Sequence, residues 1–172
     1  MTPDQGRFFL STFLPVIEEE HRATTKVINS VPDEHSDWKP DEKARSASDL
    51  SQHIVSSEIW FLEAIANGEF GDPSDRAELA GKSAADLAAW YGAEYAKALE
   101  RLKGLSDDDL VRDVSFFGME THAAVYYLTY LMLHTAHHRG QLAAYLRPMG
   151  SKVPSIYGGS ADEPFTGEAA AG

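Results

Sequence analysis

Residues 121–147 read THAAVYYLTYLMLHTAHHRGQLAAYLR and form a strongly apolar segment with histidines near its middle. Residues 123–133 are apolar almost all round a helix, which is typical of a helix buried on more than one side. Pro148 follows the segment and cannot continue a helix. The segment therefore predicts a long central helix from near Thr121 to about Arg147, and a partner subunit could cover one of its apolar sides.

Three further segments have helical periodicity. The first helix is expected to begin near Thr12 and to end at Pro32, the second to follow Ser46 and end at Gly68, and the third to follow Ser83 and end at Gly104. The positions expected to face the core are Leu14, Ile17, Thr24, Val27 and Ile28 in the first helix, Leu50, Ile54, Phe61 and Ile65 in the second, and Leu87, Tyr91, Ala98 and Leu102 in the third.

The segments between the helices are rich in Pro, Gly and Asp. We expect residues 32–40 to place Trp38 against the end of the bundle, residues 67–81 to form a loop, residues 105–109 to form an acidic turn, and residues 114–118 to be extended or irregular. The whole predicts an all-α four-helix bundle with long connecting loops, as one domain over residues 1–172. About residues 150–172 form a C-terminal tail whose end we expect to be mobile.

Composition excludes several classes of function. The 172 residues include no cysteine, which removes thiolate as a metal ligand or nucleophile and fits a reducing compartment. The formal charge is −12 and no basic cluster occurs, so nucleic acid is not an expected partner. The apolar stretch at residues 8–17 is too short and too interrupted for a signal or a membrane span. We therefore expect a cytoplasmic protein.

His134 and His138 are four residues apart and face the same side of the predicted central helix. His53 interrupts the apolar stripe of the second helix, whereas His137 lies roughly 60° away from His134. Three inward imidazoles would cost free energy if left unpaired, and one divalent cation satisfies all three. Two helices would then hold one ion, Zn²⁺ or Ni²⁺ with Fe²⁺ or Mn²⁺ as alternatives, and leave a coordination position open.

Other candidate residues have weaker patterns. A di-iron carboxylate site needs two Glu-x-x-His motifs, and only Glu18 with His21 fits, in an acidic run interpreted as a solvated helix start. His21 and Glu20 could be outer-shell partners of the metal, and His35 and His122 are expected to be exposed. Arg139 and Gln141 could pair with neighbouring helices, or could orient a substrate anion or hold a histidine tautomer. No catalytic or organic cofactor-binding residue is predicted.

Four segments of the chain carry a family resemblance. They are residues 31–34 with 38–40, residues 50–54 (LSQHI), residues 134–141 (HTAHHRGQ) with 145–147, and residues 154–163 (PSIYGGSADE). In these segments the chain resembles the DinB/YfiT-like family of metal-binding four-helix bundles, named for DNA-damage inducibility. The resemblance implies His53, His134 and His138 as ligands of one metal, often in a homodimer. Its relatives include transferases and isomerases that use a low-molecular-weight thiol, bacillithiol or mycothiol.

Three functional hypotheses follow. The first is a metal-dependent enzyme of the thiol-dependent transferase or hydrolase type, which acts on a small molecule at the open coordination position. The second is a non-enzymatic stress or binding protein that a metal ion stabilises. The third is a helical interaction module with a hydrogen-bonded histidine cluster and no metal.

Overall fold

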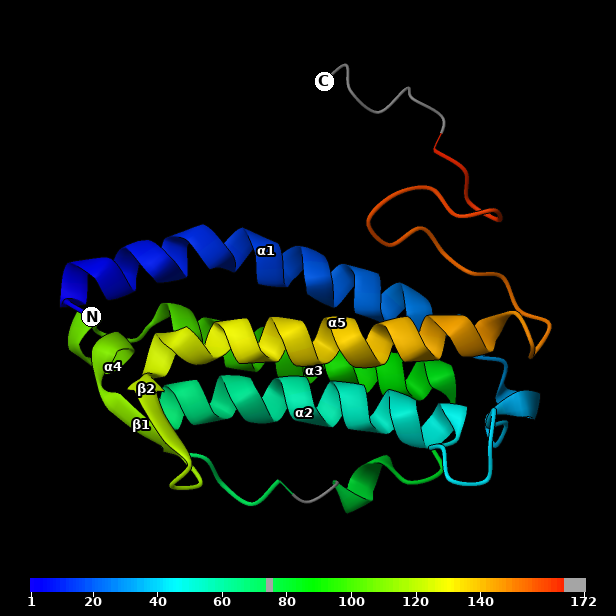
Figure 1. The fold of residues 1–172 in the computed structure, drawn as a ribbon, viewed down its shortest axis with the longest axis horizontal. Coiled ribbons are helices and arrows are strands. Elements are labelled where there is room, and N and C mark those ends of the chain that lie inside the picture. The colour runs from blue at the N-terminus through cyan, green and yellow to red at the C-terminus, as the bar shows by residue number, and fades with distance from the viewer. Residues whose placement is uncertain (74–75, 166–172) are drawn as a thin grey trace.

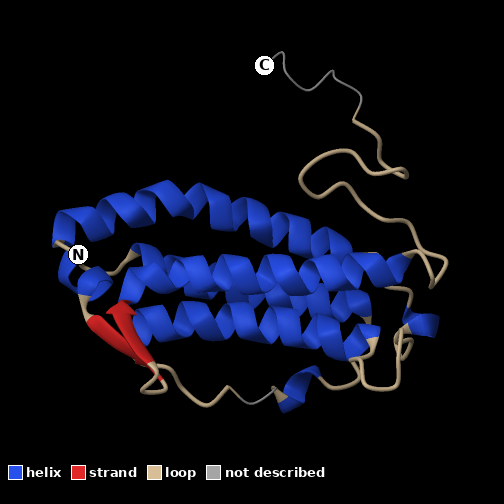
Figure 2. Cartoon of the chain, viewed as in Figure 1, coloured by secondary structure: helices blue, strands red, loops and turns tan. Residues whose placement is uncertain are grey.

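The computed structural model describes residues 1–73 and 76–165. Four long helices lie side by side along the longest axis of the molecule (Figure 1). They are α1 (Pro3–Asn29), α2 (Ala47–Asn67), α3 (Ala84–Lys103) and α5 (Tyr127–Leu146). The predicted four-helix bundle is confirmed, with one addition. A short helix α4 (Asp107–Val111) and a hairpin of β1 (Asp113–Phe116) and β2 (Glu120–Ala123) close one end of the bundle (Figure 2).

The start of α1 differs from the prediction. The Thr2 side chain accepts a hydrogen bond from the Gln5 backbone, and the Gln5 side chain accepts one from the Thr2 backbone. Pro3 sits in the first turn, where its missing N–H costs nothing. Thr12 lies inside the helix, and its hydroxyl donates to the Phe8 carbonyl at 2.8 Å. The expected start near Thr12 is therefore wrong, because a capping box ten residues earlier begins the helix.

The segment before α5 also differs. β1 and β2 pair antiparallel, with Val114 opposite His122, so residues 121–123 are a strand and α5 begins at Tyr127. The predicted extended segment is confirmed for residues 114–116. The expected acidic turn at residues 105–109 is wrong from Asp107 onward, where α4 begins. Ser106 and Asp109 form a capping box there, which is enough to start a short helix.

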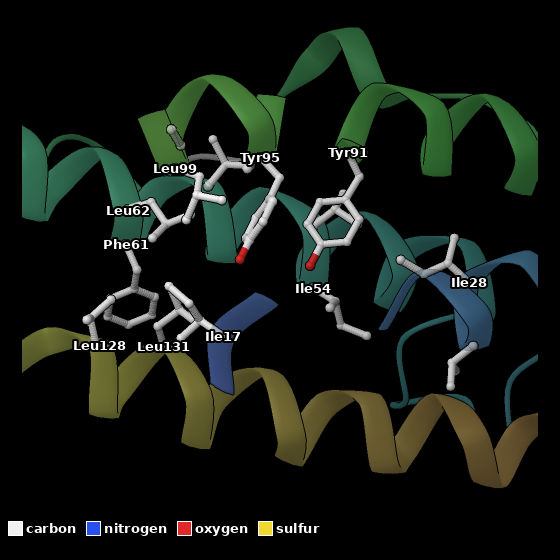
Figure 3. Close-up of a cluster of buried hydrophobic side chains, with 14 of the residues drawn as sticks. Ile17, Ile28, Ile54, Phe61, Leu62, Tyr91, Tyr95, Leu99, Leu128 and Leu131 are labelled. Carbon is white, nitrogen blue, oxygen red and sulfur yellow. The ribbon is translucent and has the colours of Figure 1, made fainter. Parts of the chain in front are cut away.

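Local signals placed α2 and α3 correctly. Ser46 and Ser83 cap the two helices by accepting from the Asp49 and Asp86 backbones, and Gly68 ends α2 at φ 81°. The predicted core positions are buried except Leu14, which is half-buried. Side chains from α1, α2, α3 and α5 meet in one apolar core, and Tyr91 and Tyr95 project into it from α3 (Figure 3).

The connecting segments return to the bundle. Residues 68–73 and 76–83 run along α2, where the Trp60 indole donates to the Gly71 carbonyl at 3.1 Å. Trp38 packs edge-on against Tyr145 at the end of the bundle, as predicted. The tail is anchored as far as Asp162, which pairs with Arg147 at 2.7 Å. Part of the end expected to be mobile, residues 166–172, lies outside the described residues.

Within residues 1–73 and 76–165, no helix combines the length and the apolarity that crossing a bilayer requires. The single domain and the cytoplasmic location stay predictions.

Candidate metal centre

The structure brings together the three histidines that the sequence singled out. His53 projects from α2, and His134 and His138 project from α5, which packs against α2. The ring centroid of His53 lies 5.0 Å from that of His134 and 4.6 Å from that of His138, and the other two are 4.5 Å apart. One ring nitrogen from each residue lies within 4.8 Å of the other two. All three side chains are half-buried, so they converge at the edge of the core.

Neighbouring side chains orient these rings. The Gln141 side-chain oxygen lies 2.8 Å from Nδ1 of His138, so Nδ1 carries the proton and Nε2 keeps its lone pair. Ser57 Oγ lies 3.5 Å from Nδ1 of His53. Nδ1 of His134 is buried without a hydrogen-bond partner, which costs free energy for a polar atom. Gln141 thus orients at least one candidate metal ligand, as hydrogen-bonding neighbours usually do at metal sites.

Burial favours the neutral form of His134 and His138. Burial is the largest cause and the nearby His138, His53 and His137 act in the same direction, and together they lower the pKa of His134 to about 4. Burial also lowers the pKa of His138, against the hydrogen bond to Gln141. A neutral imidazole is the form that binds a metal ion. Three converging imidazoles, one of them with an unsatisfied buried nitrogen, are a donor set that fits a divalent cation.

A cavity of about 620 Å³ opens beside this cluster. His53 and His134 line it, together with the aromatic rings of Trp60, Phe61, Phe116 and Phe117. The cavity gives a small molecule access to two of the three histidines, which is the arrangement an open coordination position needs.

The remaining histidines lie elsewhere. His35 is exposed, as predicted. His137 is exposed on α5, and its Nε2 lies 3.1 Å from the Gln141 amide nitrogen. His122 was expected to be exposed and is half-buried, because β2 places its ring 3.2 Å from the Glu120 carboxylate and against Tyr126.

Arg139 and Gln141 take different roles. The Arg139 guanidinium is buried, with 1% of the residue exposed, and donates to the Glu20 carboxylate at 2.6 Å and to Thr24 at 3.1 Å. It also donates to the hydroxyl of Tyr157 in the tail. The interpretation of Arg139 as a partner of neighbouring helices is correct, and its alternative role with a substrate anion is not supported. Gln141, in contrast, holds the His138 ring.

The acidic run of α1 is not a solvated helix start, so that interpretation is wrong. Glu20 is buried against Arg139, and His21 stacks on Tyr95 with ring centroids 3.8 Å apart. Both residues belong to a buried polar network between α1, α3 and α5, and neither is placed with the histidine cluster.

A second part of this buried polar network is centred on Glu58, which the sequence analysis did not identify. Glu58 of α2 is fully buried; Thr135 donates to its carboxylate at 3.1 Å, and Nδ1 of His21 lies 3.9 Å away. Burial raises the pKa of Glu58 to about 7 and lowers the pKa of His21 to about 4. Glu58 follows Ile54 by four residues, so a carboxyl group on the apolar stripe was the available signal.

Comparison with known proteins gives the family. Residues 5–167 match the model of the DinB family. The chain belongs to this family. DinB-type structures share its fold: a DinB-like protein from Bacillus cereus superposes with a TM-score of 0.74 at 26% identity, over 86% of this chain and 97% of that one.

Two relatives come from Bacillus subtilis. YjoA is 29% identical over 141 residues, which cover 80% of this chain and 89% of YjoA. YrdA is 28% identical over 155 residues, which cover 90% of this chain and 91% of YrdA. The crystal structure of YjoA, a DinB-like protein, has a TM-score of 0.67 at 24% identity, over 86% of this chain and 96% of that one. Both relatives are described as uncharacterised proteins, so their names suggest no activity for this chain.

Proposed function

We propose that this DinB protein binds one divalent metal ion through His53, His134 and His138 and is a metal-dependent enzyme of the thiol-dependent transferase or hydrolase type. The observation that carries the proposal is the convergence of three imidazoles, two of which line a cavity large enough for a small molecule. A closed structural site would bury its ligands away from such a cavity.

Different residues of the chain would have different roles in the reaction. A bound divalent ion lowers the pKa of a water or thiol at its open position, which supplies an anionic nucleophile near neutral pH. Gln141 fixes the His138 ring in the tautomer that leaves Nε2 free. The aromatic side chains of the cavity exclude water from the substrate and give its apolar part a surface to contact.

The packing of the bundle favours an exchangeable ion over a purely structural one. The apolar core joins α1, α2, α3 and α5, and the ion pair of Arg139 with Glu20 links α5 to α1. Neither depends on the histidine cluster. We therefore expect a chelator to remove the metal and leave the helical fold intact, in contrast to a metal-stabilised stress or binding protein, which would unfold.

Activity assays test the enzyme. Metal-loaded protein should conjugate a small thiol to an electrophile, or hydrolyse an ester or amide, faster than chelator-treated protein. His53→Ala should lose the metal-dependent rate, and His137→Ala should retain it because His137 is exposed outside the cluster. Equal rates with and without metal in both reaction types would contradict the proposal.

The homodimer is a separate proposal. Leu133 is 71% exposed on α5, so a partner subunit would have an apolar side chain of this helix to cover. Light scattering should give twice the chain mass at micromolar concentration. A monomer mass would remove the dimer without affecting the metal centre.

A further inference from the structure

We propose that the cavity beside the three histidines selects small molecules with an apolar aromatic body and a cationic group, such as aryl-alkyl ammonium compounds. The proposal rests on the proposed function and names its substrate class, since the cavity would hold the molecule whose reacting group meets His53 and His134. A volume of about 620 Å³ lies within the range of ordinary small-molecule sites.

Aromatic rings form the apolar part of the cavity. The Trp60 ring stacks on Phe117, with centroids 6.1 Å apart and planes 15° apart, and meets Phe116 edge-on at 6.4 Å. The hydrogen bond from its indole to Gly71 holds Trp60 in place. Rigid aromatic rings bind an apolar body by contact area, and their faces attract cations through the ring quadrupole.

Phe117 is an unusual residue for its position. Its φ is 51° and that of Gly118 is 73°, and the Met119 backbone donates to the Phe116 carbonyl at 3.0 Å. This is the tight turn in which Asn and Gly are strongly preferred, because both central residues need positive φ. The phenylalanine side chain is also 51% exposed, so it adds little to the core. Its ring forms part of the cavity wall, which points to contact with a ligand.

The charges of the cavity favour a cation. Of the described residues that line it, Arg76 alone carries a fixed positive charge, and its guanidinium pairs with the Glu63 carboxylate at 2.7 Å. Two further carboxylates line the cavity: Glu69 and Glu78. With a formal charge of −12 on the whole chain, the local field attracts cations and repels anions. Apolar rings beside more carboxylates than cationic side chains match an aromatic ammonium ion and reject a carboxylate.

Three probes of similar size test this selectivity: the trimethyl(2-phenylethyl)ammonium cation, neutral 2-phenylethanol and the 3-phenylpropionate anion. The quaternary ammonium keeps its charge at every pH and cannot ligate a metal. Calorimetric titration of the full chain at low ionic strength should give the affinity order cation, neutral, anion, with about tenfold or more between the two charged probes. The difference should shrink in high salt because the carboxylates are exposed.

Matched variants separate charge from shape. The double variant Glu69→Gln with Glu78→Gln should lower the cation-to-anion ratio by about threefold or more. The double variant Glu34→Gln with Glu100→Gln removes the same charge from exposed sites outside the cavity and should leave the ratio unchanged. Phe117→Asn suits the turn and removes the ring, so it should weaken all three probes.

The titrations are run with and without one equivalent of Zn²⁺, so that the two proposals fail separately. Cation selectivity without zinc binding would contradict the metal centre only. Equal affinities for cation and anion, no binding of any probe, or an equal loss of selectivity in the control double variant would overturn the cavity proposal, whatever zinc does.

Discussion

Glu58→Gln should change how the stability of the protein depends on pH. The carboxyl group of Glu58 is fully buried and has a pKa of about 7, compared with 4.5 for an exposed glutamate. The folded state therefore keeps this proton between pH 4.5 and pH 7, where the unfolded chain releases it. Stability from this group is present below pH 4.5 and is lost as the pH rises through 7.

The magnitude follows from the two pKa values. One pKa unit corresponds to about 1.4 kcal/mol, so ionised Glu58 destabilises the fold by about 3 kcal/mol above pH 7. The facing groups are His21 and Glu20 from α1, Tyr91 and Tyr95 from α3, and Thr135 and Arg139 from α5. The lowered pKa of His21 acts in the opposite sense, because its stability is lost as the pH falls from 6.5 through 4. His21 is present in both proteins, so this effect cancels in the comparison to first order.

Urea denaturation followed by circular dichroism measures the effect. The free energy of unfolding of Glu58→Gln minus that of the unmodified protein should rise by about 3 kcal/mol between about pH 4.5 and about pH 8. Glu100→Gln, at an exposed glutamate of α3, should show no such rise. If the curves of Glu58→Gln and the unmodified protein run parallel across this range, the pKa of Glu58 is not raised in the folded state.

Three further substitutions have expected outcomes. Gln141→Ala frees the His138 ring and should lower zinc affinity by about 10–100-fold in competition titrations, whereas unchanged affinity would contradict its orienting role. Arg139→Met leaves the buried Glu20 carboxylate without its partner and should cost about 3–5 kcal/mol in urea denaturation; a loss below about 1 kcal/mol would refute this. Gly68→Ala forces a Cβ into positive φ and against Arg112, and should cost about 1–2 kcal/mol. Its control, Gly92→Ala, has open space inside α3 and should be neutral or stabilising.

The correct predictions from sequence concern local interactions. Ser46 and Ser83 cap helices through contacts three residues away, and His134 and His138 are brought to one face by the helical repeat itself. His53 could be added because a polar residue on an apolar stripe has to face the same interior. These signals lie within one or two helical turns, so the chain alone reveals them.

The missed features depend on contacts between distant segments or on competing local signals. Arg139 and Glu20 are 119 residues apart in the sequence, and Tyr157 and Glu20 are 137 apart. No local sequence pattern therefore predicts that these side chains pair. Residues 121–123 have a helical pattern and become a strand because residues 113–116 pair with them. The start of α1 has a local signal at Thr2, but Thr12 with Pro15 three residues later is a competing signal for a helix start.

Metal analysis of untagged protein tests the central claim most directly. After loading with zinc and desalting, the unmodified chain and the His137→Ala variant should each hold about one ion per chain. His53→Ala, His134→Ala and His138→Ala should each lose it while circular dichroism shows a helical fold. An unmodified chain that binds no divalent metal, or three variants that all retain the ion, would contradict the account.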